Sequence, residues 1–230
     1  GIKVFAETCP QYLFLTAQDL DQPGLEGAKW MCSPPPRSTE DQNALWRALE
    51  LGDLQLVSSD HAPYRFDESG KLSAGSNPDF KQIANGLPGL ETRLPLLFDA
   101  MVSQGRSSLE KFVELTATAP AKIYGLHPRK GTIAVGADAD IAIWNPDREV
   151  MLTDDGLHDN VGYNPFSGRV LRGWPETILR RGDVIIADGM LQAMPGSGQL
   201  QLREPAASMR PTGHLSPEFD PQTNFGADLL

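Results

Sequence analysis

Hydrophobic and polar positions follow two different periods along this chain. Through the first half, apolar residues recur at helical spacing and predict helices that begin near Thr39, Leu90, Leu109 and Thr118. From Lys130 onward the pattern changes to short β runs between turn residues, at positions 132–135, 139–144, 177–180 and 184–189. Two further apolar runs predict buried parallel strands, at positions 2–7 and 54–60. The pattern therefore predicts an α/β segment followed by a smaller β-rich one.

The segments between these elements carry their own signals. Three consecutive prolines, Pro34 to Pro36, fix the backbone and are expected to hold Ser33 in a defined place. Residues 65–78 are rich in charge, Gly and Ser and predict a mobile loop over a site. From Met194 the hydrophobic period is lost. We therefore expect three regions, 1–127, 128–193 and an extended or disordered arm over 194–230.

A carboxylate stands where the second predicted strand ends. The run from Leu54 to Val57 leads into Ser58-Ser59-Asp60-His61, and Pro63 then ends the ladder. In an α/β barrel, residues at the carboxyl ends of strands face the active-site mouth, where an Asp can bind a divalent metal or take a proton. Taken alone, the pair has a simpler interpretation, in which Asp60 caps a turn and His61 is a satisfied polar neighbour.

Composition excludes several classes of function. The formal net charge of −10 disfavours nucleic acid as a partner, because phosphate binding needs a basic surface. No apolar run approaches the roughly 18 residues of a membrane span and no signal peptide opens the sequence, so we expect a cytoplasmic enzyme with no membrane partner. Cys9 and Cys32 lack metal-type spacing and are interpreted as reduced core thiols.

Several ordered motifs together resemble the hydantoinase and dihydropyrimidinase family of the amidohydrolase superfamily, with the bacterial D-hydantoinase branch most similar. Besides Ser59-Asp60-His61-Ala62-Pro63, they are AETCPQYL at 6–13, CSPPPR at 32–37, DFKQIANGLPG at 79–89, PAKIYGL at 120–126 and GTIAVGADAD at 131–140. The Ser-Asp-His triplet alone would be a weak signal, whereas the ordered set spans residues 5 to 145.

The resemblance implies the C-terminal part of a metal-dependent TIM-like (β/α)8 barrel with part of a small β-sandwich. It implies hydrolytic opening of cyclic amides, namely 5-substituted hydantoins and dihydropyrimidines, to N-carbamoyl amino acids. Asp60 would be both a metal ligand and the general acid/base, while Ser33 and Asn85 would bind the substrate ring. The resemblance also implies two divalent metal ions, with zinc as the first choice, and a full-length enzyme that is a homo-oligomer. His127, His158 and His214 are interpreted as surface or loop residues without a metal role.

Two predicted barrel strands are far fewer than a closed barrel needs, so the sequence is interpreted as the C-terminal half of an enzyme, inactive alone. A short split subunit is the alternative. Two other functions stay open: a different cyclic amidase, such as an allantoinase or dihydroorotase, and a non-catalytic assembly protein like the collapsin response mediators. Asp60 argues against the second, because a protein without a metal site does not need a carboxylate there.

Overall fold

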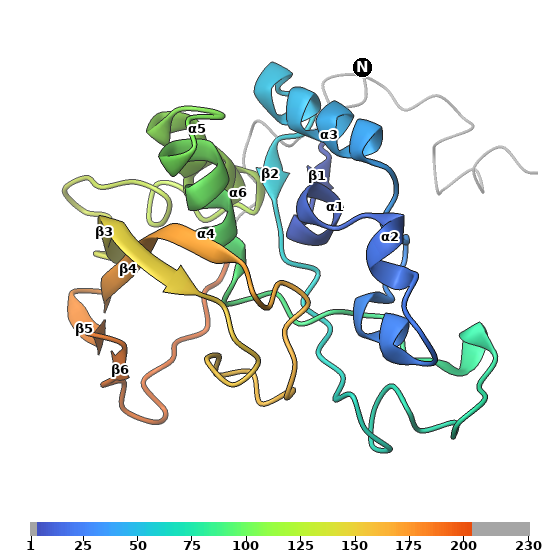
Figure 1. Ribbon diagram of the computed structural model, residues 1–230. Helices are drawn as coiled ribbons and strands as arrows, with labels where there is room; N and C mark the ends of the chain where they lie inside the picture. Colours follow the sequence, from blue (N-terminus) through green and yellow to red (C-terminus); the bar gives the residue numbers. More distant parts are fainter. Residues whose placement is uncertain (1–3, 204–230) are drawn as a thin grey trace, which may run out of the picture.

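A computed structural model describes residues 4–203 as a mixed α/β chain with two separate sheets (Figure 1). The first sheet is a parallel pair, β1 (Glu7–Thr8) and β2 (Leu56–Val57), with Glu7 opposite Leu56. The second is antiparallel and four-stranded, in the order β3-β4-β5-β6. Helices from the middle of the chain contact both sheets and lie between them.

The parallel pair is short, and Thr8, Leu56 and Val57 are buried while Glu7 is exposed. Helix α1 (Pro10–Phe14) begins directly after β1, with Pro10 at its first turn, where a missing N–H costs nothing. Helix α3 (Thr39–Leu51) precedes β2. Its predicted apolar stripe is confirmed, because Trp46 and Leu49 are buried in one core cluster with Val57 of β2.

Helix α3 begins where the sequence predicts, at Thr39, because a capping box closes its first turn. Ser38 Oγ accepts a hydrogen bond from the Asp41 N–H at 3.3 Å, and the Asp41 carboxylate accepts one from the Ser38 N–H at 3.0 Å. The helix ends at Gly52, whose φ of 83° lies in the left-handed region. Three shorter helical turns lie in the connecting segments: α2 (Ala17–Leu20), η1 (Glu26–Trp30) and η2 (Phe80–Gln82).

Two helical runs follow, and each contains a π-helical turn. Helix α4 (Arg93–Phe98) continues as η3 (Asp99–Ser103), and α5 (Leu109–Val113) continues as η4 (Glu114–Thr118) and α6 (Ala119–Ile123). The predicted helices near residues 90, 109 and 118 are thereby confirmed. Phe98 stacks on Trp144, with ring centroids 4.4 Å apart, which joins these helices to the antiparallel sheet.

The antiparallel sheet is a meander of consecutive strands. Its members are β3 (Ile141–Met151), β4 (Val170–Arg180), β5 (Asp183–Ala187) and β6 (Met190–Leu191). The predicted strands at 139–144, 177–180 and 184–189 fall within or at the edge of β3, β4 and β5, although β3 and β4 are much longer than predicted. Residues 194–203 form no helix or strand, and the rest of the predicted arm lies outside the described residues.

One strand prediction is wrong, and the strands predicted at 2–7 and 54–60 are confirmed only in part, as Glu7–Thr8 and Leu56–Val57. Residues 132–135 form no strand, and Ile133 and Val135 are exposed, because no described strand pairs with them and glycines at positive φ flank them at 131 and 136. The strand predicted at 2–7 is reduced to Glu7–Thr8, since pairing extends only as far as β2 reaches. Val4 and Phe5 are exposed, and residues 1–3 lie outside the described part. Over residues 4–203, no helix combines the length and apolar character that a bilayer crossing needs.

Candidate active site

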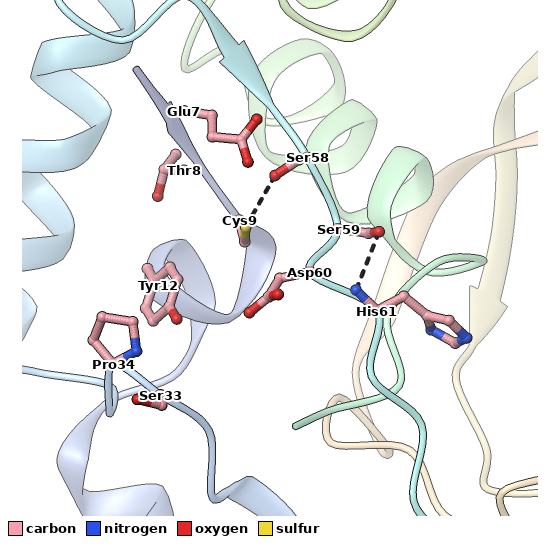
Figure 2. A pocket seen from close by; sticks show the side chains of 10 residues that line it. All are labelled: Glu7, Thr8, Cys9, Tyr12, Ser33, Pro34, Ser58, Ser59, Asp60 and His61. Atoms are coloured by element: carbon pink, nitrogen blue, oxygen red, sulfur yellow. Dashed lines mark hydrogen bonds between the residues drawn. The ribbon is translucent and has the colours of Figure 1, made fainter. Parts of the chain in front are cut away.

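An open hollow of about 470 Å³ lies at the carboxyl ends of β1 and β2 (Figure 2). Polar groups from three separate stretches of the chain meet there. The lining residues are Glu7, Thr8, Cys9, Tyr12, Ser33, Pro34, Ser58, Ser59, Asp60 and His61. Parallel strands present their ends to one edge of a sheet, so the residues just after β1 and β2 become neighbours although about 50 positions separate them in sequence.

Asp60 lies after β2 in a backbone conformation that few side chains adopt. Its φ is 46°, in the left-handed region that Asp tolerates better than most residues. The carboxylate is exposed to the hollow and is directed toward Cys9 and Tyr12 (Figure 2). Gln11, a buried residue of α1, donates from Nε2 to Asp60 Oδ2 at 3.4 Å. Backbone strain of this kind is concentrated at functional sites, and here it directs a carboxylate into a cavity.

The wall beside Asp60 holds groups that stay neutral. Cys9 Sγ lies 3.2 Å from Ser58 Oγ, and burial raises the pKa of the Cys9 thiol. Burial also raises the pKa of the Tyr12 phenol, with smaller contributions from Cys32 and Asp60, so Tyr12 keeps its proton at neutral pH. Both cysteines are free and buried, which confirms their interpretation as reduced core thiols.

The structure brings two of the three predicted site residues together. Ser33 and Asp60 line the same hollow, and Asn85 is exposed and is not among the lining residues. The segment that carries Asn85 is nevertheless tied to the segment that carries Ser33, because the Gly86 N–H donates to the Met31 carbonyl at 3.1 Å. A role for Asn85 in ring binding therefore stays a prediction.

His61 supports the neighbouring loop through its ring. Its Nδ1 accepts hydrogen bonds from the N–H groups of Gly89 and Leu90, at 3.1 and 3.2 Å, so Nδ1 carries no proton in this arrangement. The ring points away from Asp60 (Figure 2). His127 and His158 are exposed, as predicted, and His158 contacts Glu91, whereas His214 lies outside the described residues.

The donor set does not by itself fit a metal ion. Among residues 4–203, no three His, Cys, Asp or Glu side chains converge on one point. Tight binding of zinc takes three or four ligands held in a preformed geometry. Asp60 is the one ligand that we assign, and the neighbouring His61 already uses Nδ1 for the backbone.

Gln11 and Tyr12 support the site but receive no role in the sequence analysis. Both lie in the 6–13 motif, whose Pro10 follows a predicted strand. A proline just after a strand also fits the first turn of a helix, and this signal would have predicted α1. That short helix turns Gln11 and Tyr12 back toward the end of β2.

The model of the Amidohydrolase family matches residues 16–185, most of the chain. The chain belongs to the amidohydrolase family. Enzymes of this family are generally metal-dependent. Among curated proteins, the chain is 46% identical over 203 residues to the D-hydantoinase of Rhizobium radiobacter. The matched segment covers 88% of this chain and 44% of that protein.

Solved structures of amidohydrolases give the same result. The dihydropyrimidinase from Brevibacillus agri is 41% identical with a TM-score of 0.85, over 90% of this chain and 44% of that one. The L-hydantoinase from Arthrobacter aurescens is 34% identical with a TM-score of 0.73, over 85% of this chain and 42% of that one. The chain thus spans less than half the length of the relatives that it matches.

Proposed function

We propose that this chain contributes the proton-transferring carboxylate and part of the ring-binding surface of a cyclic amidase. The reaction is hydrolytic opening of 5-substituted hydantoins or dihydropyrimidines to N-carbamoyl amino acids. The observation that carries the proposal is Asp60, held at a strand end in a left-handed conformation and directed into a hollow that Ser33 also lines. The hydantoinase and dihydropyrimidinase names of the relatives described above support the substrate class.

Asp60 performs the proton transfer. Hydrolysis of a ring amide requires a proton to leave the attacking water and a proton to reach the departing nitrogen, which is otherwise a poor leaving group. A carboxylate beside the scissile bond serves both steps in turn, first as base and then as acid. Gln11 donates to one carboxylate oxygen, Oδ2, which leaves Oδ1 for the proton. The neutral thiol and phenol of Cys9 and Tyr12 place no competing charge beside it.

The ring is held by the segments that carry Ser33 and Asn85. Amide and ureide rings present alternating N–H and C=O groups, which backbone and side-chain polar groups can match in pairs. Ser33 follows a buried cysteine and precedes three prolines, so its backbone has little freedom. Asn85 stands before Gly86, where the backbone turns at a φ of 148°.

The metal requirement extends beyond this chain. We propose that an enzyme of the relatives' full length binds two divalent cations, with zinc as the preferred metal and Asp60 as one ligand. The described residues supply no further cluster of ligands, so the steps above are assigned to the chain's own side chains.

The surrounding architecture follows the same proposal. Residues 1–127 would belong to a (β/α)8 barrel, of which β1 and β2 are members, and residues 128–193 to a β-sandwich, with residues 194–230 as an arm. We also propose that the full-length enzyme is a cytoplasmic homo-oligomer. The allantoinase, dihydroorotase and collapsin-response-mediator alternatives are not favoured, because the relatives described above are named as hydantoinases or dihydropyrimidinases.

A hybrid enzyme tests the proposed function. In it, this 230-residue chain replaces the segment that it matches in the D-hydantoinase of Rhizobium radiobacter. We expect the zinc-loaded hybrid enzyme to open hydantoin and dihydrouracil. Ring opening is measured by the appearance of the corresponding N-carbamoyl products. Turnover of allantoin or dihydroorotate alone would favour the other amidases. A folded, metal-loaded hybrid that opens no ring would contradict a catalytic role for this chain.

A further inference from the structure

A lysine is completely buried in the middle of a polar loop. Lys71 belongs to residues 65–78, yet its side chain is 0% exposed and its neighbour Gly70 is also buried. The predicted mobility of this loop is not tested, but its centre is packed, which its composition did not indicate. Lys71 Nζ donates hydrogen bonds to the carbonyl oxygens of Met31 and Ala84, both at 3.0 Å.

Those two carbonyls belong to the segments that bind the ring in the proposed function. Met31 lies two residues before Ser33, and Ala84 lies directly before Asn85. The Met31 carbonyl also accepts the Gly86 N–H, so the two segments meet around one ammonium group. Lys71 itself is not among the residues that line the hollow, and any effect on the substrate must pass through these backbones.

Burying this cation is expensive, and its partners offset only part of the cost. The partners in the described structure are neutral carbonyl groups, whereas buried lysines are usually paired with a carboxylate. Burial accordingly lowers the pKa of Lys71 to about 8, and Cys32 acts in the opposite direction with a smaller effect than burial. A methionine would fill the same space without this cost, so an ammonium at this position is better explained by the geometry that it imposes than by stability.

The backbone around Lys71 is shaped to deliver it. The Lys71 N–H donates to the Arg65 carbonyl at 2.8 Å, which closes the loop on itself. A Cβ on Gly70 would lie 2.1 Å from that carbonyl oxygen, so only glycine allows this closure. A Cβ on Gly86 would similarly lie 2.5 Å from the Ala62 Cβ, and only glycine brings residues 84–86 against the strand-end segment.

We propose that Lys71 is a positioning residue that fixes the spacing between the Ser33 and Asn85 segments and thereby sets the affinity for the cyclic substrate. The inference rests on the proposed function, because it takes those segments as the ring-binding surface. It predicts an effect on ground-state and transition-state binding together, since Lys71 touches no reacting atom. A loss of such uniform binding raises KM and leaves kcat unchanged.

Kinetics of the hybrid enzyme separate positioning from catalysis. Lys71→Met keeps the volume and removes the donors, and we expect KM for hydantoin to rise by at least about tenfold, the scale of one lost charge-assisted hydrogen bond, with kcat within about twofold. Lys71→Gln retains a neutral donor and should give a smaller rise, and it carries the test if the methionine variant does not fold. Lys81→Met removes an exposed lysine of the same region and should change neither constant.

Hydrogen exchange measures the positioning directly and does not depend on turnover. In the hybrid enzyme, Lys71→Met should accelerate exchange of the Gly86 amide, which donates to Met31, while amides of β3 and β4 keep their protection. Unchanged Gly86 exchange, an unchanged KM, or a loss confined to kcat would each overturn the inference. A wild-type hybrid that opens no ring would instead contradict the proposed function, and the exchange result would still decide the role of Lys71.

Discussion

At the scale of single residues, the site depends on side chains that other residues hold in place. The position of Asp60 at a strand end could be predicted from the sequence, because the apolar run before it and Pro63 after it are local signals, whereas its catalytic role is implied only by the family resemblance. Its partner Gln11 could not be predicted in this way, because the 3.4 Å contact exists only once β1 and β2 pair. The burial of Lys71 could not be predicted for the same reason, because it depends on two carbonyl groups at distant positions in the sequence.

Lys71 also gives the stability a predictable pH dependence. Its pKa is about 8 when buried, against an ordinary value of 10.5, so between these values the unfolded chain binds the extra proton. The free energy of unfolding must then rise with pH across this window, because the burial cost of the charge disappears as the folded lysine loses its proton. Cys32, whose pKa burial raises to about 11, titrates in both proteins and largely cancels from a comparison.

Melting temperatures of the hybrid enzyme with Lys71 and with Lys71→Met measure this effect. The difference between the two proteins should shift in favour of Lys71 as pH rises from about 7.5 to about 10. A difference that is constant, or that shifts the other way, would show that the ammonium is not buried as described.

At the scale of elements, helices were predicted well and strands poorly. The start of α3 follows from Ser38 and Asp41, which lie three positions apart and stabilise the first turn without help from the rest of the chain. The strand predicted at 132–135 has suitable β-branched residues but no partner among the described strands. A strand needs a neighbour to accept its hydrogen bonds, and residue type alone cannot supply that information.

The capping box of α3 is testable by one substitution. Ser38→Ala removes the side chain that accepts the Asp41 N–H, and loss of such a cap costs about 1 kcal/mol. Exchange of the Asp41 amide in the hybrid enzyme should therefore accelerate about fivefold. Ser76→Ala, at an exposed loop position, is the matched control and should leave that amide unchanged. Equal exchange in both variants would contradict the cap.

At the scale of the whole molecule, the described residues leave apolar surface uncovered. A groove of about 1100 Å³ runs between the α5–α6 helices and β3, with Phe98, Phe112, Ile133 and Trp144 among its lining residues. The parallel sheet consists of two short strands. Each relative described above is more than twice as long as the segment that matches this chain, so the matching comparison covers only part of their architecture.

The chain expressed alone should therefore neither open cyclic ureides nor retain zinc. Tight metal binding needs several converging ligands, and no three candidate ligand side chains converge among the described residues. Open sheet edges and exposed apolar surface also favour aggregation. Metal analysis after gel filtration, together with a hydantoin assay, checks this expectation. Stoichiometric zinc with measurable turnover would show that the chain is a complete enzyme and that the hybrid is unnecessary.

The central claim is that Asp60 transfers the proton in ring opening, and Asp60→Asn in the hybrid enzyme tests it most directly. The amide keeps the size of the side chain and removes its ability to take a proton, so kcat for hydantoin should fall by at least about 100-fold with an unchanged melting temperature. Asp53→Asn makes the same chemical change at an exposed position before β2 and should leave kcat as it is. Near-normal turnover by the Asp60→Asn enzyme would contradict the account.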